Sequence, residues 1–236
     1  MALFKFRAAC DPGHPEVDPF APMRPPVNPS GIRLDRPRAG RRRPVRAGTR
    51  AAWEVLSEEI RACRRCPLGA LRTHAVVYRG SLVPRVVFVG EAPGAEEDRQ
   101  GLPFVGRSGR RLDAAVARLG LSPADYGVLN VLKCRPPSNR FDPRAARVCR
   151  PYLHRQLALL RPELLVTLGA HALSALDPAA PRVLLAAGRP RSTDRGPLFP
   201  LIHPAAALRS RRWHRRWEAD LARLGRWWDR RATESL

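Results

Sequence analysis

Apolar positions along the chain follow two alternating patterns. Four runs of five residues are mostly apolar: residues 85–89, 128–132, 164–168 and 198–202. Short runs of this kind are typical of strands that are buried on both faces of a parallel sheet. The segments between them show helical spacing instead. Leu112, Ala115, Val116 and Leu119 recur on one helical face before Gly120, which predicts a helix that ends there. Further helices are predicted over residues 143–160, 170–176 and 211–230.

Strands that alternate with helices favour an α/β fold. We therefore predict a four-stranded, mainly parallel sheet flanked by helices. Such sheets bind ligands beyond the carboxyl ends of their strands. Three polar residues fall at that edge: Glu91 after the first run, Asn130 inside the second, and His203 after the fourth. Each alone also fits a structural role, as a solvated loop residue, a hydrogen-bonded core amide or a turn residue.

Asn130 is the most informative of the three. An amide in an apolar run is costly to bury unless it finds hydrogen-bond partners. The residue therefore indicates a ligand with adjacent donor and acceptor groups, such as a nucleobase. The loop from Gly101 to Ser108 superficially matches a phosphate-binding loop, but it does not follow a strand directly and Pro103 removes one backbone N–H. Phe104 in that loop is either a stacking platform for a base or a hydrophobic plug.

The chain carries five cysteines, and no signal peptide is recognisable, which favours metal binding over disulfides and a cytoplasmic location. Cys63 and Cys66 form a CxxC pair that is followed by Pro67, whereas Cys134 and Cys149 lie far downstream. Zinc ribbons generally use two compact CxxC pairs. The dispersed spacing favours an iron–sulfur cluster over zinc.

The first 50 residues differ in composition from the rest. They are rich in proline, include three consecutive arginines at 41–43, and show neither helical nor strand periodicity. We predict a disordered arm over residues 1–50 and one domain over residues 51–236, in which Trp53, Val55, Leu56 and Ile60 form the buried face of a first helix.

The chain has a formal net charge of +22, with 43 Lys and Arg against 21 Asp and Glu. Such a charge favours a polyanionic partner. Its weight is reduced because nearly every basic residue is Arg in a chain rich in Ala and Pro, as a GC-biased genome would produce. No apolar run is long enough to span a bilayer, so no membrane partner is expected.

Together these motifs resemble family 4 of the uracil-DNA glycosylase superfamily, the bacterial and archaeal iron–sulfur enzymes. The likeness covers about residues 53 to 230. It is carried by CRRCPL from Cys63, GEAPGAEEDRQGLPFVGRSG from Gly90 to Gly109, NVLKCRPPSNR from Asn130 to Arg140, CRPYL from Cys149 to Leu153, and HPAA from His203 to Ala206.

The resemblance implies specific roles at the matching positions. Phe104 would stack on a flipped uracil, Asn130 would read its edge at N3 and O4, and the backbone around Glu91 and Ala92 would hold O2, which His203 would also face. Glu91 would handle the attacking water, with Glu97 as a second acidic candidate. A [4Fe–4S] cluster would be held by Cys63, Cys66, Cys134 and Cys149.

The resemblance also implies an activity: hydrolysis of the bond between uracil and deoxyribose in DNA by a monomer, leaving an abasic site. One alternative is a relative that binds uracil-DNA covalently without turnover, but the loop from Arg135 to Val148 lacks the His expected of it. Others are a non-enzymatic iron–sulfur DNA-binding module and a branch that acts on other deaminated bases.

Overall fold

The computed structural model describes residues 44–234, and side chains as far as residue 231. Most of the predicted arm, including Cys10, lies outside the described residues. The first helix, α1 (Thr49–Ala62), begins two residues before the predicted start of the domain.

The described residues form one six-stranded sheet in the order β1-β3-β2-β4-β6-β5. The α/β class is confirmed, but the prediction of four strands is wrong. The central strands β3, β2, β4 and β6 are parallel, and β1 and β5 add antiparallel edges. Both edge strands are two or three residues long and polar, so they left no apolar run in the sequence. The bounds are β1 Arg79–Gly80, β2 Val86–Gly90, β3 Tyr126–Asn130, β4 Leu164–Leu168, β5 Arg191–Thr193 and β6 Gly196–Leu201.

Strand β3 begins and ends two residues earlier than predicted, so Asn130 is its last residue and does not lie inside it. The apolar run starts at Val128 because Gly127 interrupts it. Gly127 nevertheless belongs to the strand. A larger residue would not fit there, because its Cβ would overlap the hydroxyl of Tyr78. Beyond Asn130 the chain continues beside the neighbouring loop, with Val131 N–H donating to the Gly90 carbonyl at 3.0 Å.

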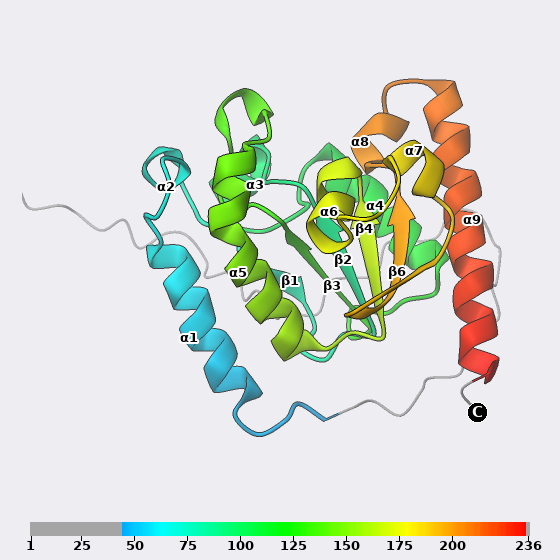
Figure 1. Cartoon of the computed structure of the whole chain (residues 1–236), viewed down its shortest axis with the longest axis horizontal. Coiled ribbons are helices and arrows are strands. Elements are labelled where there is room, and N and C mark those ends of the chain that lie inside the picture. The colour runs from blue at the N-terminus through cyan, green and yellow to red at the C-terminus, as the bar shows by residue number, and fades with distance from the viewer. Residues whose placement is uncertain (1–43, 235–236) are drawn as a thin grey trace, which may run out of the picture.

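Helices cover both faces of the sheet (Figure 1). Alternate residues of one strand point to opposite faces, and β2 divides in this way: Phe88 belongs to one core cluster, whereas Val87 and Val89 belong to the other. The first cluster is closed by α4 (Arg107–Arg118), α8 (Pro204–Ala207) and α9 (Arg211–Glu234), the second by α1, α5 (Pro143–Leu160), α6 (Ala170–Leu176) and α7 (Val183–Ala186). The remaining short helices are α2 (Leu68–Leu71), α3 (Ala95–Gln100) and the 3₁₀ turn η1 (Pro137–Asn139).

The buried face of α1 differs from the predicted one at one position. Trp53, Leu56 and Ile60 are buried, but Val55 is 60% exposed and Ser57 is buried in its place. Positions 53, 56, 57 and 60 follow the three- and four-residue spacing of a single helical face, and position 55 does not. The Ser57 hydroxyl is satisfied by donating to the Trp53 carbonyl at 2.7 Å.

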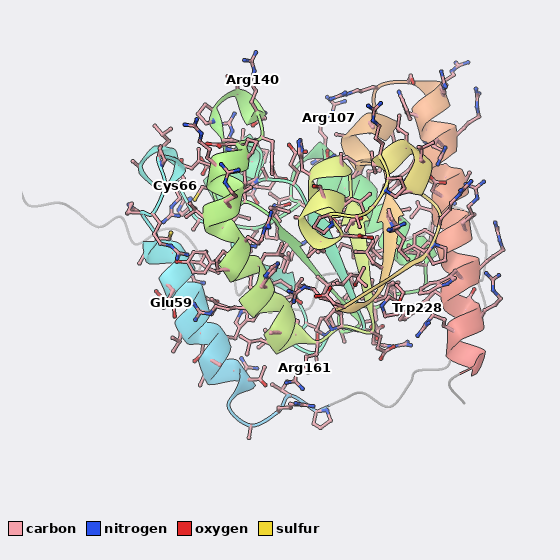
Figure 2. The ribbon with its side chains drawn as sticks, viewed as in Figure 1. Glu59, Cys66, Arg107, Arg140, Arg161 and Trp228 are labelled. Carbon is pink, nitrogen blue, oxygen red and sulfur yellow. The ribbon has the colours of Figure 1, made fainter. Side chains whose placement is uncertain are left out.

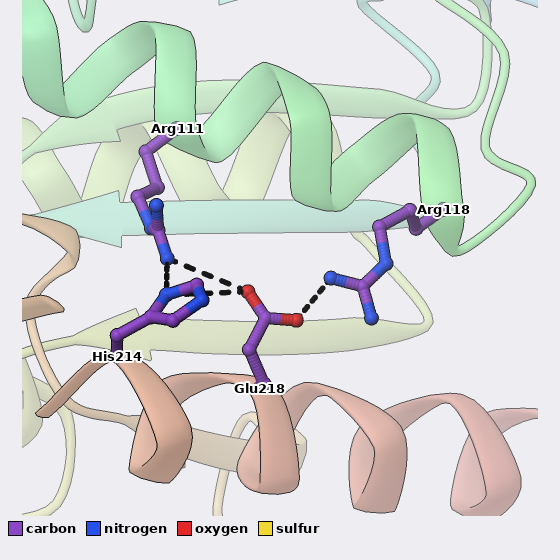
Figure 3. A network of polar contacts seen from close by, with 4 residues as sticks. All are labelled: Arg111, Arg118, His214 and Glu218. Carbon is purple, nitrogen blue, oxygen red and sulfur yellow. Dashed lines mark hydrogen bonds and ion pairs between the residues drawn. The ribbon is translucent and has the colours of Figure 1, made fainter. Parts of the chain in front are cut away.

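Helix α9 packs on the sheet through its tryptophans, and Trp213 and Trp217 share a face because they are four residues apart. Trp217 is 1% exposed and Trp213 is partly buried against the same cluster. Figure 3 shows how Glu218 of α9 joins this helix to α4: its carboxylate lies 3.4 Å from Arg111 and also pairs with Arg118. Within residues 44–234, no helix combines the length and apolar character needed to cross a membrane.

Candidate active site

Polar residues from separate loops meet at the carboxyl edge of the sheet. Strand β2 ends at Gly90, immediately before Glu91, and pairs in register with β3 so that Gly90 lies opposite Asn130. Strand β6 ends at Leu201, and His203 follows as the N-cap of α8. The structure thus brings Glu91, Asn130 and His203 to one edge, as the parallel arrangement of the strands predicts.

The Asn130 amide is buried without hydrogen bonds. The residue is 1% exposed, and neither its Oδ1 nor its Nδ2 has a partner among the described residues. Burying an unpaired amide costs about 1 to 3 kcal/mol by protein mutational data. A residue that bears this cost and faces the ligand-binding edge is suited to a ligand that offers both an acceptor and a donor.

Phe104 and Gly90 complete the surroundings of this amide. A Cβ added at Gly90 would overlap Asn130 Oδ1 and lie 2.5 Å from the Phe104 ring, so only glycine allows the ring and the amide to approach so closely. Phe104 is 5% exposed, and its backbone has a positive φ of 57°. The backbone of Gly109 packs directly against this turn, because a Cβ at Gly109 would overlap the Phe104 carbonyl. Phe104 therefore packs as part of the core while its ring borders Asn130.

His203 lies beside this ring, with the two ring centroids 6.0 Å apart. Its Nδ1 accepts a hydrogen bond from the Ala205 N–H at 3.1 Å, which puts the imidazole proton on Nε2. Burial lowers the pKa of His203, opposed by the negative charge of Glu91 and assisted by the positive charge of Arg209. At neutral pH His203 is therefore an uncharged donor through Nε2. We call Gly90, Phe104, Asn130 and His203 the Asn130 site.

Glu91 has a partner that the sequence analysis missed. His171, in the first turn of α6, places its Nδ1 2.8 Å from Glu91 Oε2. The imidazole also stacks on Phe141, with ring centroids 3.9 Å apart and planes 11° from parallel. His171 comes two residues after Gly169, which ends the third apolar run, so the rule that selected Glu91 and His203 could have found it too.

Glu97 occupies a different position from Glu91. Its carboxylate accepts backbone N–H groups of Gly94 at 3.1 Å, Val105 at 3.0 Å and Gly106 at 2.9 Å. These bonds tie the loop after β2 to the loop that carries Phe104. Ala92, which follows Glu91, is partly buried and packs against the cysteine-containing cluster.

The four predicted cysteines come together from separate elements. Cys63 and Cys66 lie between α1 and α2, Cys134 follows β3, and Cys149 lies in α5. All four are free of disulfides. Electrostatic coupling links Cys149 to Cys66 and Cys63, and Cys134 to Cys149 and Cys66. Leu68, Leu132 and Ala145 surround the two buried thiols.

The local chemistry of these cysteines suits a thiolate-bound cluster. Burial raises the pKa of the Cys134 and Cys149 thiols, which disfavours free thiolates there. Arg72 Nη1 nevertheless donates to Cys134 Sγ at 3.0 Å. Across residues 44–231, no three His, Cys, Asp or Glu side chains are grouped closely enough for a single metal ion. The donor set here is four thiols with the Arg72 guanidinium beside Cys134, which is the chemistry that a thiolate-bound cofactor requires.

An α/β sheet that gathers an unpaired amide, an aromatic ring and an imidazole at its carboxyl edge is the arrangement of a protein that binds a ligand beyond the ends of its parallel strands. Comparison with known families agrees: residues 77–223 match the family model of the Uracil DNA glycosylase superfamily.

Within this superfamily the chain is similar to several type-4 uracil-DNA glycosylases. It is 40% identical over 161 residues to the type-4 uracil-DNA glycosylase of Thermotoga maritima, an alignment that covers 67% of this chain and 84% of that protein. The type-4 uracil-DNA glycosylase of Archaeoglobus fulgidus is 37% identical over 177 residues, or 71% of this chain and 88% of that protein. That of Saccharolobus solfataricus is 38% identical over 166 residues, covering 66% and 76% respectively. The chain belongs to the type-4 uracil-DNA glycosylases, and the resemblance noted in the sequence is confirmed.

Proposed function

We propose that this protein is a uracil-DNA glycosylase that hydrolyses the N-glycosidic bond of deoxyuridine in DNA, acting in the cytoplasm as a monomer. Water adds to C1′ of the sugar, the bond to N1 breaks, and uracil leaves as an anion that takes up a proton. The abasic site remains in the strand. The observation that carries the proposal is the buried Asn130 amide without a partner.

Uracil supplies what that amide lacks. Its N3–H donates to Asn130 Oδ1 and its O4 accepts from Nδ2, so binding removes the cost of two unpaired atoms. Cytosine would be rejected because its unprotonated N3 and its N4 amino group reverse this pattern. Phe104 supplies the aromatic surface for the flipped base.

His203 and Glu91 carry the chemistry in this proposal. As the bond breaks, negative charge develops on uracil O2, and the Nε2–H of His203 donates to it. One positioned donor of this kind contributes about 3 to 4 kcal/mol to the transition state. Glu91 orients the water and stabilises the positive charge on the sugar. Glu97 supports both groups indirectly, by holding the loops before and after α3.

We further propose that Cys63, Cys66, Cys134 and Cys149 bind a [4Fe–4S] cluster. The cluster would hold four thiolates in a shell that excludes water and would fix the loop after β3, four residues beyond Asn130. Its contribution here is structural, since none of the proposed chemical steps passes through it.

Alkali-revealed cleavage of labelled oligonucleotides tests the function. The substrates carry one uracil, opposite G or in a single strand, and matched strands carry thymine. After treatment with wild-type protein, we expect alkali to break only the uracil strands. Asn130→Ala should abolish this cleavage, and Gln100→Ala, which changes an exposed amide on α3, should keep it. Binding of uracil strands without cleavage, or their covalent capture, would instead identify a non-turnover relative.

A further inference from the structure

His171 makes two directed contacts at the edge of the proposed active site. Its Nδ1 lies 2.8 Å from Glu91 Oε2. The Nδ1 edge of the His171 ring therefore faces Glu91.

One face of the His171 ring lies against Phe141. The two rings are stacked at 3.9 Å, and Phe141 lies in the segment between Cys134 and Cys149, partly buried against both the cysteine-containing cluster and the core cluster under α5. His171 therefore connects Glu91, on the loop after β2, with the segment anchored by two of the cysteines.

Both contacts matter because neither member of the pair is held by burial. The Glu91 side chain is 29% exposed and that of His171 is 46% exposed. A partly exposed glutamate side chain samples several rotamers unless a partner favours one of them. A half-exposed histidine is itself a weak constraint unless its ring is fixed, and the stack on Phe141 fixes it.

We propose that His171 is a positioning residue, which holds the Glu91 carboxylate in the orientation needed to direct water at C1′, and that Phe141 holds His171 in turn. This inference rests on the proposed function. It assigns no contact with the substrate to His171 or Phe141. It concerns two residues that lie outside the motifs that carry the family resemblance.

The test compares single-turnover rates and KM on a uracil-containing strand. We expect His171→Ala to lower the rate by about 10- to 100-fold, up to the loss caused by misplacing a reacting group by about 1 Å, with KM changed less than about twofold. His171→Asn should stay within about threefold of wild type, because the Asn amide donates from nearly the position of His Nδ1. Phe141→Leu, which keeps the apolar contact but not the stack, should fall between them. His154→Ala, a partly buried histidine on α5, is the matched control and should match wild type.

A double-mutant cycle separates positioning from general stability. If His171 acts only through Glu91, adding His171→Ala to Glu91→Ala should cause no further loss. An equal loss in both backgrounds, or a rate for His171→Ala equal to that of His154→Ala, would overturn the inference while wild-type cleavage still supported the function. Absence of wild-type cleavage would overturn both. Should His171→Ala fold poorly, the His171→Asn and Phe141→Leu rates still decide the result.

Discussion

At the scale of single residues, the buried Asn130 amide is the feature that supports the proposed binding of a base. This amide is surrounded by core residues, has no partner among residues 44–231 and lies at the end of a central strand. Stability alone would favour an apolar side chain there. The residue is best explained by a ligand that completes its hydrogen bonds.

This reasoning gives the first prediction. Asn130→Leu should raise the free energy of unfolding by about 1 to 2 kcal/mol, because it removes two buried unpaired atoms without leaving a cavity. The same variant should lose uracil excision. Urea unfolding and the cleavage assay measure the two effects, and a variant that is both less stable and inactive would show that Asn130 has a structural role.

His203 makes a pH-dependent contribution to stability. Burial lowers its pKa in the folded protein, so below the unfolded value of about 6.5 the unfolded chain binds the extra proton more readily. Stability should therefore fall as the pH drops from 7 towards the folded pKa. His203→Gln, which cannot titrate, should flatten this dependence in urea unfolding at pH 7 and pH 5. An unchanged slope would mean that other groups, such as His154 with its similarly lowered pKa, are responsible.

The catalytic role of His203 has its own test. His203→Ala should reduce excision by about two to three orders of magnitude, the effect of losing one oxyanion donor, with the melting temperature close to that of wild type. Wild-type turnover by the variant would remove His203 from the mechanism.

At the scale of elements, the four cysteines come from three parts of the chain, and two of these, α1 and α5, also pack together in one core cluster. The cysteines link the α1–α2 junction, the segment after β3 and helix α5. Helix α5 begins where the Asp142 carboxylate accepts the Arg144 N–H at 2.8 Å, and Cys149 lies on the buried face of this helix. A bound cluster would therefore stabilise the surroundings of Asn130 through three elements at once.

Cluster loss should accordingly be visible in both colour and stability. Cys134→Ser should abolish the brown absorbance and lower the melting temperature by about 5 to 10 °C, equivalent to about 2 to 3 kcal/mol for a domain of this size. Cys10→Ser is the matched control and should keep both properties. A colourless wild-type protein with full activity would refute the cluster.

At the scale of the whole molecule, the arginines that contribute to the net charge of +22 lie at different ends of the sheet. Figure 2 shows Arg107 and Arg140 projecting at the end of the molecule where the strands finish, whereas Arg161 lies at the opposite end. If DNA binds at the proposed active edge, the arginines there are expected to neutralise its phosphates. Those at the far end are expected to contribute only long-range attraction.

Salt dependence distinguishes these two groups. Affinity for uracil-DNA should fall steeply as salt rises, and Arg140→Ala should reduce the slope of log K against log salt by about 1, the value for one lost phosphate contact. Arg161→Gln should leave the slope unchanged. Fluorescence anisotropy with an Asn130→Ala background, which prevents turnover, measures both; equal slopes for the two variants would exclude Arg140 from the DNA interface.

The sequence by itself determined the four central strands, most of the helices and the edge at which the site lies. Apolar runs and helical spacing are local patterns, and the carboxyl ends of parallel strands meet at one edge whatever the details of packing. The apolar pattern and the cysteine spacing also indicated Glu91, Phe104, Asn130, His203 and the four cysteines, and the family motifs added Ala92, Glu97 and the role expected of each.

Only the tertiary structure decided the features that depend on contacts between distant segments. The short polar edge strands β1 and β5 exist because β3 and β6 offer them free backbone groups, not because of their own composition. Asn130 lacks partners, Glu97 has three backbone donors, and His171 is held between Glu91 and Phe141. Hydrogen bonding and stacking of this kind depend on distances across the fold, and no periodicity along the chain encodes them.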